Sequence, residues 1–303
     1  MILVTGATGT VGSEVVRQLV ASGERPRAFV RDPRTAREML GPGVEYVAGD
    51  LDRPETLPVA LTGVDRVFLL TRQSSRQFDQ ERAVVDAAVV AGVRHVVKLS
   101  VFRADDRSEL QIARQHAAME RYAEQSGIPC TFVRPLFFMQ NLAGQALNGA
   151  IHSATGTGRV AMVDARDVAS VVVHALTGSG CERKTHTLTG PQALSFDEVA
   201  ETLSTRLGTH IPHVRVTPDA VRDATLRAGV EAWFAEDMAR LHTMLAAGYE
   251  DVVTDDVVVA TGTTPRSLAE FGSDIAERFA GRWSRGPVPS EARQERVTTP
   301  PPP

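Results

Sequence analysis

The chain opens with a strand-like run that breaks into three evenly spaced glycines. Ile2-Leu3-Val4 is short and apolar, and Gly6, Gly9 and Gly12 follow it. Apolar residues then recur at helical spacing up to Gly23: Val11, Val15, Val16, Leu19 and Val20. A strand, a glycine turn and a helix N-terminus together form an anion site, because the free N–H groups of the first helical turn face outward. The pattern predicts a dinucleotide-phosphate site at Gly6, Thr8, Gly9, Thr10, Val11 and Gly12; the alternative is a glycine-rich turn that binds nothing.

Up to about Pro135, short apolar strands alternate with amphipathic helices. We expect strands at 2–4, 27–31, 44–48, 67–70, 95–99 and 131–133, and helices at 35–40, 55–61, 78–91 and 110–126. Such alternation indicates βαβ units with right-handed crossovers. The expected fold is therefore α/β: a Rossmann domain with a doubly wound parallel sheet.

After Pro135 the pattern changes. We expect short strands at 160–163, 186–188 and 214–216, and helices at 168–176, 196–207, 218–227, 231–247 and 265–278. The expected N-caps are Asp167, Ser195, Thr217 and Thr264. The sequence thus predicts an NAD(P)-binding Rossmann domain at 1–135 and a smaller, mostly helical substrate lobe at 136–285, interleaved with the Rossmann sheet. Residues 286–303, rich in proline and charge, are predicted to be a disordered tail.

Composition and charge exclude several classes of protein. A net charge of −4 gives no electrostatic case for nucleic-acid binding. No apolar run is long enough to span a membrane and no signal peptide is evident, so we expect a soluble cytoplasmic protein. The two cysteines, Cys130 and Cys181, cannot form a disulfide framework. The histidines show no metal-ligand spacing, and no metal is predicted.

Residues that follow the strands are candidate ligand contacts, because ligands bind at the carboxyl ends of such strands. Arg31 after the second strand is suited to the 2′-phosphate of NADPH. The alternative is that Arg31 is a solvated charge and Asp32 accepts the ribose hydroxyls of NAD.

Residues after the later strands are candidate cofactor contacts for the same reason. Asp50 and Leu51 are suited to the adenine, although Asp50 could instead cap the following helix. Leu70 and Thr71 fall where the central ribose would pass, and Ser100 falls near the nicotinamide. Pro135, Phe137 and Phe138 would form an apolar wall there, unless these large side chains serve only as core.

Several motifs together resemble one family. Thr5-Gly6-Ala7-Thr8-Gly9 resembles the atypical branch of the short-chain dehydrogenase/reductases. Further marks are Val30-Arg31-Asp32-Pro33, Gly49-Asp50-Leu51, Phe138-Met139-Gln140-Asn141 and Val163-Asp164-Ala165-Arg166-Asp167-Val168-Ala169. From Met1 to about Phe279 the chain resembles the NmrA-like family, which includes bacterial type-2 NAD(P)H:quinone oxidoreductases and redox-sensing regulators. The resemblance implies a Rossmann domain with a small C-terminal substrate lobe and a cleft between them.

The Tyr-x-x-x-Lys pair of that superfamily is absent. The tyrosine slot falls on Ile112 and the lysine slot on His116. His116 is the candidate catalytic residue, as a contact to the nicotinamide ribose or as a proton donor. The alternative is a partly exposed helical histidine paired with Glu120. Candidate substrate contacts are Phe137, Phe138, Asn141, Trp233 and Phe234.

Two functions follow from these observations. The first is an NADPH-dependent oxidoreductase that transfers hydride to a quinone or a conjugated aromatic carbonyl, with a natural-product tailoring reductase as a variant of it. The second is a non-enzymatic NADP-sensing regulator that binds a partner protein, which the missing tyrosine and lysine favour. The expected partner is a small aromatic or quinone substrate, with no nucleic acid and no membrane; a homodimer is left open.

Overall fold

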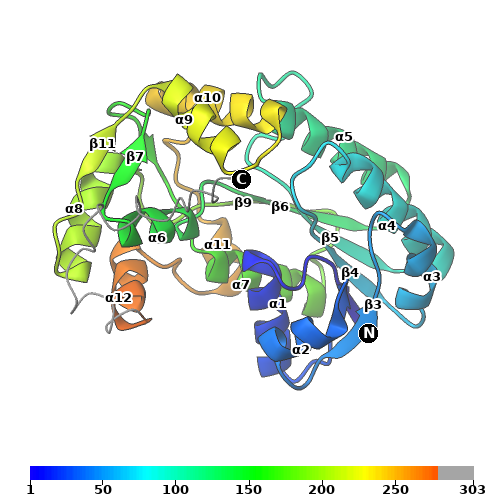
Figure 1. The fold of residues 1–303 in the computed structure, drawn as a ribbon. Helices are drawn as coiled ribbons and strands as arrows, with labels where there is room; N and C mark the ends of the chain where they lie inside the picture. Colours follow the sequence, from blue (N-terminus) through cyan, green and yellow to red (C-terminus); the bar gives the residue numbers. More distant parts are fainter. Residues whose placement is uncertain (279–303) are drawn as a thin grey trace, which may run out of the picture.

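A seven-stranded sheet forms the centre of the computed structural model, which describes residues 1–278 (Figure 1). Its strand order is β3-β2-β1-β4-β5-β6-β9, and neighbouring strands all pair in parallel. The strands are β1 Ile2–Val4, β2 Arg27–Val30, β3 Glu45–Ala48, β4 Arg66–Leu69, β5 His95–Leu99, β6 Cys130–Pro135 and β9 Thr185–Leu188. The order reverses between β1 and β4, the point where doubly wound sheets bind ligands. The expected Rossmann fold is confirmed.

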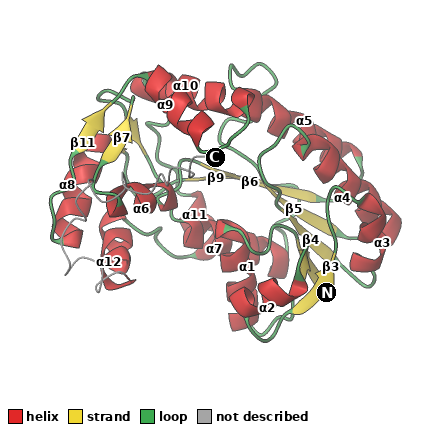
Figure 2. Cartoon of the chain, viewed as in Figure 1, coloured by secondary structure: helices red, strands yellow, loops and turns green. Residues whose placement is uncertain are grey.

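Helices cover both faces of this sheet (Figure 2). One face packs against α1 Thr10–Ala21, α2 Pro33–Leu40, α7 Ala165–Thr177 and α11 Asp256–Thr261. The other packs against α3 Leu57–Ala60, α4 Gln77–Ala91 and α5 Gln111–Gln125, with the 3₁₀ turn η1 Pro54–Thr56 before α3. Apolar side chains of these helices pack on the sheet, as the spacing of apolar residues predicts. α4 departs from this pattern, because it also buries Gln77 and Glu81 and exposes Val89 and Val90.

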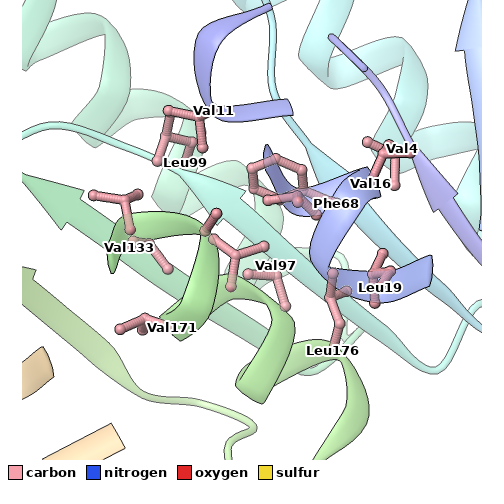
Figure 3. Close-up of a cluster of buried hydrophobic side chains, with 14 of the residues drawn as sticks. Val4, Val11, Val16, Leu19, Phe68, Val97, Leu99, Val133, Val171 and Leu176 are labelled. Carbon is pink, nitrogen blue, oxygen red and sulfur yellow. The ribbon is translucent and has the colours of Figure 1, made fainter. Parts of the chain in front are cut away.

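The core under α1 shows how the glycine turn is held. Leu19 of α1 lies beside Leu176 of α7, Val16 of α1 lies beside Phe68 of the sheet, and Val171 of α7 belongs to the same cluster (Figure 3). All five side chains are at most 1% exposed. Burial of such side chains contributes about 1.5–3 kcal/mol each. The start of α1 is therefore fixed by packing along its length.

A second group of elements follows β6. Its helices are α6 Gln140–Leu147, α8 Phe196–Leu207, α9 Pro218–Arg227, α10 Ala232–Ala246 and α12 Leu268–Arg278. β7 Ile151–Ser153 pairs in parallel with β11 His213–Arg215, and β8 Arg159–Val160 pairs antiparallel with β10 Leu194–Ser195. A separate apolar cluster holds them together, with Leu142, Phe196, Leu203 and Phe271 among its buried members. This C-terminal lobe lies beyond β9 and arches back over α5 (Figure 1).

One capping contact fastens the lobe to the Rossmann half. The buried carboxylate of Asp237 in α10 accepts the backbone N–H groups of Gln111, at 3.0 Å, and Ile112, at 2.7 Å. These are first-turn donors of α5, which have no partner within their own helix. β9 joins the sheet and α7 covers one of its faces, although both come from residues after 136, so the two halves are interleaved. A domain boundary at 135 and 136 stays a prediction.

Some expected elements were wrong in detail. Asp164, not Asp167, caps α7, since its side chain accepts the N–H of Arg166, whereas Asp167 binds Arg266. α12 begins at Leu268 rather than at 265, where Ser267 and Glu270 exchange hydrogen bonds. The strand expected at 160–163 ends at Val160. The helix expected at 55–61 is η1 followed by the single turn α3.

Two helices were not expected at all. α6 contains two weak helix formers, Asn141 and Gly144, and has no side-chain cap. Buried Leu142 and Ala146 anchor it to the lobe core. α11 is a short apolar turn held against α7 by Val257 and Ala260. The tail predicted at 286–303 lies outside the described residues. No helix within residues 1–278 is long and apolar enough to cross a bilayer.

Candidate functional site

The glycine turn leaves no room for side chains at two of its positions. Gly6 has a φ of +59°, and a Cβ there would lie 2.8 Å from the carbonyl oxygen of Leu70. A Cβ at Gly12 would lie 2.1 Å from the carbonyl oxygen of Gly6. The N–H of Gly9 donates to that same oxygen at 3.0 Å. The turn is therefore drawn tightly between β1, β4 and the first turn of α1.

The start of α1 is open. Gly9 is the N-cap and supplies no side-chain cap, and Thr8, Gly9 and Thr10 are exposed. The first-turn N–H groups of α1 thus keep free donors at the positive end of the helix dipole, which suits a phosphate. The geometry fits the pyrophosphate site that the sequence predicts.

Thr5 is a structural residue of this turn that sequence reasoning missed. Its hydroxyl accepts from the N–H of Leu70 at 2.8 Å and donates to the carbonyl oxygen of Leu70 at 2.8 Å. It joins the ends of β1 and β4 beside Gly6. A threonine placed between an apolar strand and the first glycine was the available signal.

Arg31 and Asp32 have different surroundings. Asp32 is the N-cap of α2: its carboxylate accepts the N–H of Arg34 at 2.9 Å and the hydroxyl of Thr35 at 2.6 Å, which lowers its pKa. Arg31 is exposed at the end of β2, and its side chain makes no hydrogen bond or ion pair with the rest of the described chain. The guanidinium is thus available to a ligand while the carboxylate is occupied, which favours the 2′-phosphate interpretation.

The side chains after β3 form a turn. Oδ1 of Asp50 accepts the N–H of Asp52 at 3.1 Å, and the helix caps that follow are Arg53 and Thr56. The alternative that Asp50 caps the next helix is therefore wrong. Leu51 packs at the margin of the apolar cluster under α3 and α4. The predicted adenine contact at these two residues remains a prediction.

Leu70 and Thr71 lie at the carboxyl end of β4. Leu70 is half-buried against the core and borders Gly6. The hydroxyl of Thr71 donates to Oε1 of Glu81 at 2.7 Å, so this side chain faces α4. Thr71 could therefore contact the cofactor only through its backbone.

A buried polar network behind β5 escaped the sequence analysis. Nζ of Lys98 is fully buried and lies 2.8 Å from Oε2 of Glu81, 3.0 Å from Nδ1 of His116 and 3.0 Å from the carbonyl oxygen of Leu99. Gln77 of α4 donates to Oε1 of Glu81 at 3.1 Å. The network joins α4, β5 and α5 under the expected nicotinamide end. The lysine inside an apolar strand was its only signal in the sequence.

His116 is buried within this network and is 4% exposed. The alternative of a partly exposed histidine paired with Glu120 is wrong, because Glu120 binds Arg134 and the hydroxyl of Ser100 instead. Burial lowers the pKa of His116 well below its usual range, and Lys98 and Arg134 lower it further. The ring is therefore neutral at neutral pH. Its predicted catalytic role remains a prediction.

The ends of β5 and β6 hold Ser100 and Pro135. Both are buried, and the hydroxyl of Ser100 donates to Oε1 of Glu120 at 2.5 Å. The N–H of Phe102 donates to the carbonyl oxygen of Pro135 at 3.2 Å, so the two strands stay paired to this point. Contacts from Ser100 and Pro135 to the nicotinamide stay predictions.

The candidate substrate residues pack into different clusters. Phe137 stands edge-on to Phe196 of the lobe core at 6.1 Å, whereas Phe138 packs on the sheet core. Trp233 and Phe234, with ring centres 5.5 Å apart, pack against buried Leu110, Ile112 and Ala113 around the start of α5. Asn141 is exposed on α6. Phe137 and Phe138 thus lie at the end of β6, and the other three lie elsewhere on the lobe.

A buried carboxyl group at the same edge was missed as well. Glu250 is 5% exposed, and its Oε2 accepts the N–H of Phe137 at 3.3 Å. Burial raises the pKa of Glu250 to about 7, although the nearby Arg103 guanidinium opposes the shift. Nothing in the sequence around Gly248-Tyr249-Glu250 marks it.

Across residues 1–278, no three histidine, cysteine, aspartate or glutamate side chains come together as a metal site.

Three known proteins resemble this chain along most of its length. The NAD(P)H azoreductase of Xenophilus azovorans is 41% identical over 283 residues, covering 92% of this chain and 99% of that protein. Among solved structures, the NADPH complex of the Escherichia coli quinone oxidoreductase QOR2 superposes with a TM-score of 0.80 at 26% identity, covering 91% of this chain and 99% of that one. The Citrobacter sp. triphenylmethane reductase complexed with NADP(H) gives 0.77 at 29% identity, with the same coverage.

The family model described as the NmrA-like family matches residues 1–265. That match covers the glycine turn, the sheet and most of the lobe. The chain therefore belongs to the NmrA-like family.

Proposed function

We propose that this NADPH-dependent oxidoreductase transfers hydride to a quinone or another conjugated aromatic acceptor. One observation carries the proposal: a complete dinucleotide turn stands in a chain that has Ile112 and His116 where the superfamily has its tyrosine and lysine. Ile112 is buried against Trp233 and Phe234, and its own side chain offers no acid at this position. A ketone needs such an acid, whereas a quinone is a strong hydride acceptor that depends mainly on positioning.

The residues at the carboxyl edge of the sheet define the cofactor site of this proposal. The glycine turn, at Gly6, Thr8, Gly9, Thr10, Val11 and Gly12, holds the pyrophosphate, and Arg31 holds the 2′-phosphate. Asp50 and Leu51 contact the adenine, Leu70 and Thr71 contact the central ribose, and Ser100 and Pro135 lie beside the nicotinamide. When bound, NADPH supplies the hydride.

Aromatic side chains supply the acceptor site of the proposal. Phe137 and Phe138 follow β6 directly, and flat apolar rings are well suited to stack on a conjugated acceptor. We also assign acceptor contacts on the lobe side to Trp233, Phe234 and Asn141, which lie apart from Phe137 and Phe138. The names of the relatives support this class, since they include a quinone oxidoreductase and reductases of azo compounds and triphenylmethane dyes.

A two-stage titration tests the proposal. NADPH and NADH are first titrated against the intrinsic protein fluorescence, and a panel of simple quinones is then added to the NADPH-loaded protein. We expect tight NADPH binding followed by oxidation of the nicotinamide on addition of a quinone. Binding without oxidation by any quinone would overturn the acceptor class. Failure to bind either dinucleotide would overturn the site itself.

The missing tyrosine and lysine also suit a non-enzymatic NADP-sensing regulator that binds a partner protein. Such a sensor binds the dinucleotide and consumes none with any acceptor. A natural-product tailoring reductase differs in another way, because it turns over with its own aromatic substrate and not with simple quinones. The same titration therefore separates all three.

A further inference from the structure

The loop after α10 reaches back over the carboxyl ends of β5 and β6. Tyr249 stands edge-on to Phe102, with ring centres 5.6 Å apart. The guanidinium of Arg103 lies 4.9 Å from the Phe102 ring and 4.8 Å from the Tyr249 ring. Arg103 has a φ of +48°, so the backbone accepts strain to place it there. These contacts fix the residue that follows Tyr249 at the edge where the nicotinamide site is expected.

That residue is Glu250. Its Oε2 accepts the N–H of Phe137 at 3.3 Å, and its own carbonyl oxygen accepts the N–H of Ala161 at 3.3 Å. Oε1 makes no hydrogen bond with any other part of residues 1–278, and no cation comes within ion-pair distance. The side chain is therefore held at one oxygen and free at the other.

The surroundings favour the protonated form of this carboxyl group. Burial raises the pKa of Glu250 to about 7. The titratable groups that face it are Arg103, which favours the anion, and Tyr249, whose own pKa is raised by burial. An acid works best when its pKa lies near the operating pH.

The other acids and bases at this edge have partners, and the phenol of Tyr249, hydrogen-bonded to Ser108, has a pKa raised by burial. Nδ1 of His116 lies against Nζ of Lys98, and Glu120 is paired with Arg134. Ile112 removes the usual phenol. On the basis of the proposed function, we propose that Glu250 is the proton donor to the reduced acceptor, taking the place of the missing tyrosine.

Reduction of a quinone to a hydroquinone takes up two electrons and two protons. A quinone gains a hydride, which is two electrons and one proton, from the cofactor. The O–H bond of the Glu250 carboxyl breaks and a new O–H bond forms on the acceptor oxygen, or an N–H bond on an azo nitrogen. The carboxylate then recovers its proton from solvent. A triphenylmethane dye differs, because its cation becomes neutral on receiving hydride alone and needs no proton.

This difference between acceptors supplies the test. Glu250→Gln is compared with the wild-type protein at about pH 6, where both side chains are neutral. Steady-state rates are measured with one quinone and with one cationic triphenylmethane dye. We expect the ratio of quinone to dye kcat/KM to fall at least about tenfold in Glu250→Gln, as for loss of a general acid. The matched control is Asp251→Asn, an exposed carboxylate in the same loop, which should keep the wild-type ratio.

A second measurement does not depend on turnover. The infrared C=O band of a protonated carboxyl is followed as the cofactor-free protein is titrated from about pH 5 to 9. We expect one carboxyl to titrate near neutral pH in the wild-type protein and in Asp251→Asn, and to be absent from Glu250→Gln. A band that is the same in all three would overturn the proposal.

The outcomes separate the two proposals. If the wild-type protein reduces both acceptors and Glu250→Gln keeps the wild-type ratio, only the role of Glu250 is overturned. If the wild-type protein binds NADPH but reduces neither acceptor, the proposed function fails, and the role of Glu250 fails with it.

Discussion

Nζ of Lys98 lies 3.0 Å from Nδ1 of His116, inside a network in which the lysine is fully buried and the histidine is 4% exposed. Oε2 of Glu81 and the carbonyl oxygen of Leu99 complete the environment of the ammonium group. Three elements of the Rossmann half thus meet at one cation. A buried ion pair of this kind fixes the relative positions of its elements even where it adds little net stability.

Lys98→Met should therefore be severely destabilising, since it leaves the Glu81 carboxylate buried without a cation. We expect a loss of about 3–5 kcal/mol in the free energy of unfolding, measured by urea denaturation. The double variant Lys98→Met with Glu81→Met should lose less than the single variant, because the stranded charge is removed. A double variant whose loss equals the sum of both single losses would contradict the coupling.

Gly12→Ala should damage both the fold and the cofactor site, because a Cβ at this position lies 2.1 Å from the carbonyl oxygen of Gly6. We expect a loss of about 1–3 kcal/mol in stability and weaker NADPH binding, read by urea denaturation and fluorescence titration. Gly144→Ala is the control, since nothing lies within 4 Å of its added Cβ, and it should be neutral or stabilising. Wild-type NADPH affinity in Gly12→Ala would count against a tight turn at the pyrophosphate.

Arg31→Ala should change the choice of cofactor. Loss of a charge-assisted contact to the 2′-phosphate should weaken NADPH binding by about 1–3 kcal/mol and spare NADH. Asp32→Ala should instead lower the stability through loss of the α2 cap and keep the preference for NADPH. Equal losses for the two dinucleotides in Arg31→Ala, in parallel titrations, would refute the 2′-phosphate role.

Acid should destabilise the protein through His242. Burial lowers the pKa of His242 to about 4, and its Nδ1 accepts the N–H of Ala154 at 3.0 Å. Because the unfolded ring binds its proton more tightly, stability is complete above the unfolded pKa and is lost as the pH falls from about 6.5 toward 4. From pH 7.5 to 5 we expect a loss of about 1–2 kcal/mol from this group.

The matched variant is His242→Asn, whose Oδ1 can still accept from Ala154 but does not titrate. Its free energy of unfolding should fall less than that of the wild-type protein over the same pH interval, in urea denaturation at pH 7.5 and 5. Identical pH slopes would show that other groups carry the acid sensitivity.

Much of the fold could be predicted because local signals agreed with the tertiary structure. Strands such as His95–Leu99 are bounded by turns, and Ser195 and Glu198 form the capping box that their spacing predicts. The elements that the sequence did not predict are held by contacts with residues far away in the chain. α6 has two weak helix formers and no side-chain cap, and it is held by lobe-core packing. The α5 N-terminus is capped by Asp237, 125 and 126 residues away.

Residues of the candidate site likewise differ in whether local sequence or distant contacts define them. The positions of Gly6, Gly12 and Arg31 follow from one short pattern and the rule of strand ends. Lys98, Glu81 and Glu250 do not, because each acquires its chemistry from burial and from partners on other elements. A single sequence shows the charged residue and leaves its surroundings undefined. His116 illustrates this, since its spacing suggested Glu120 and its neighbour is Lys98.

The interleaving of the two halves imposes an order on biosynthesis. The apolar side of α1, including Val16 and Leu19, is covered by α7, and β6 gains its outer neighbour only when β9 exists. When β6 has just left the ribosome, the nascent chain therefore has an uncovered apolar face on α1 and an unpaired edge on β6. Both stay open until about fifty further residues have left the ribosome, some seconds at ordinary elongation rates. The nucleotide-binding half of this protein is therefore completed late, and a truncation before residue 188 should yield an aggregating fragment rather than a smaller domain.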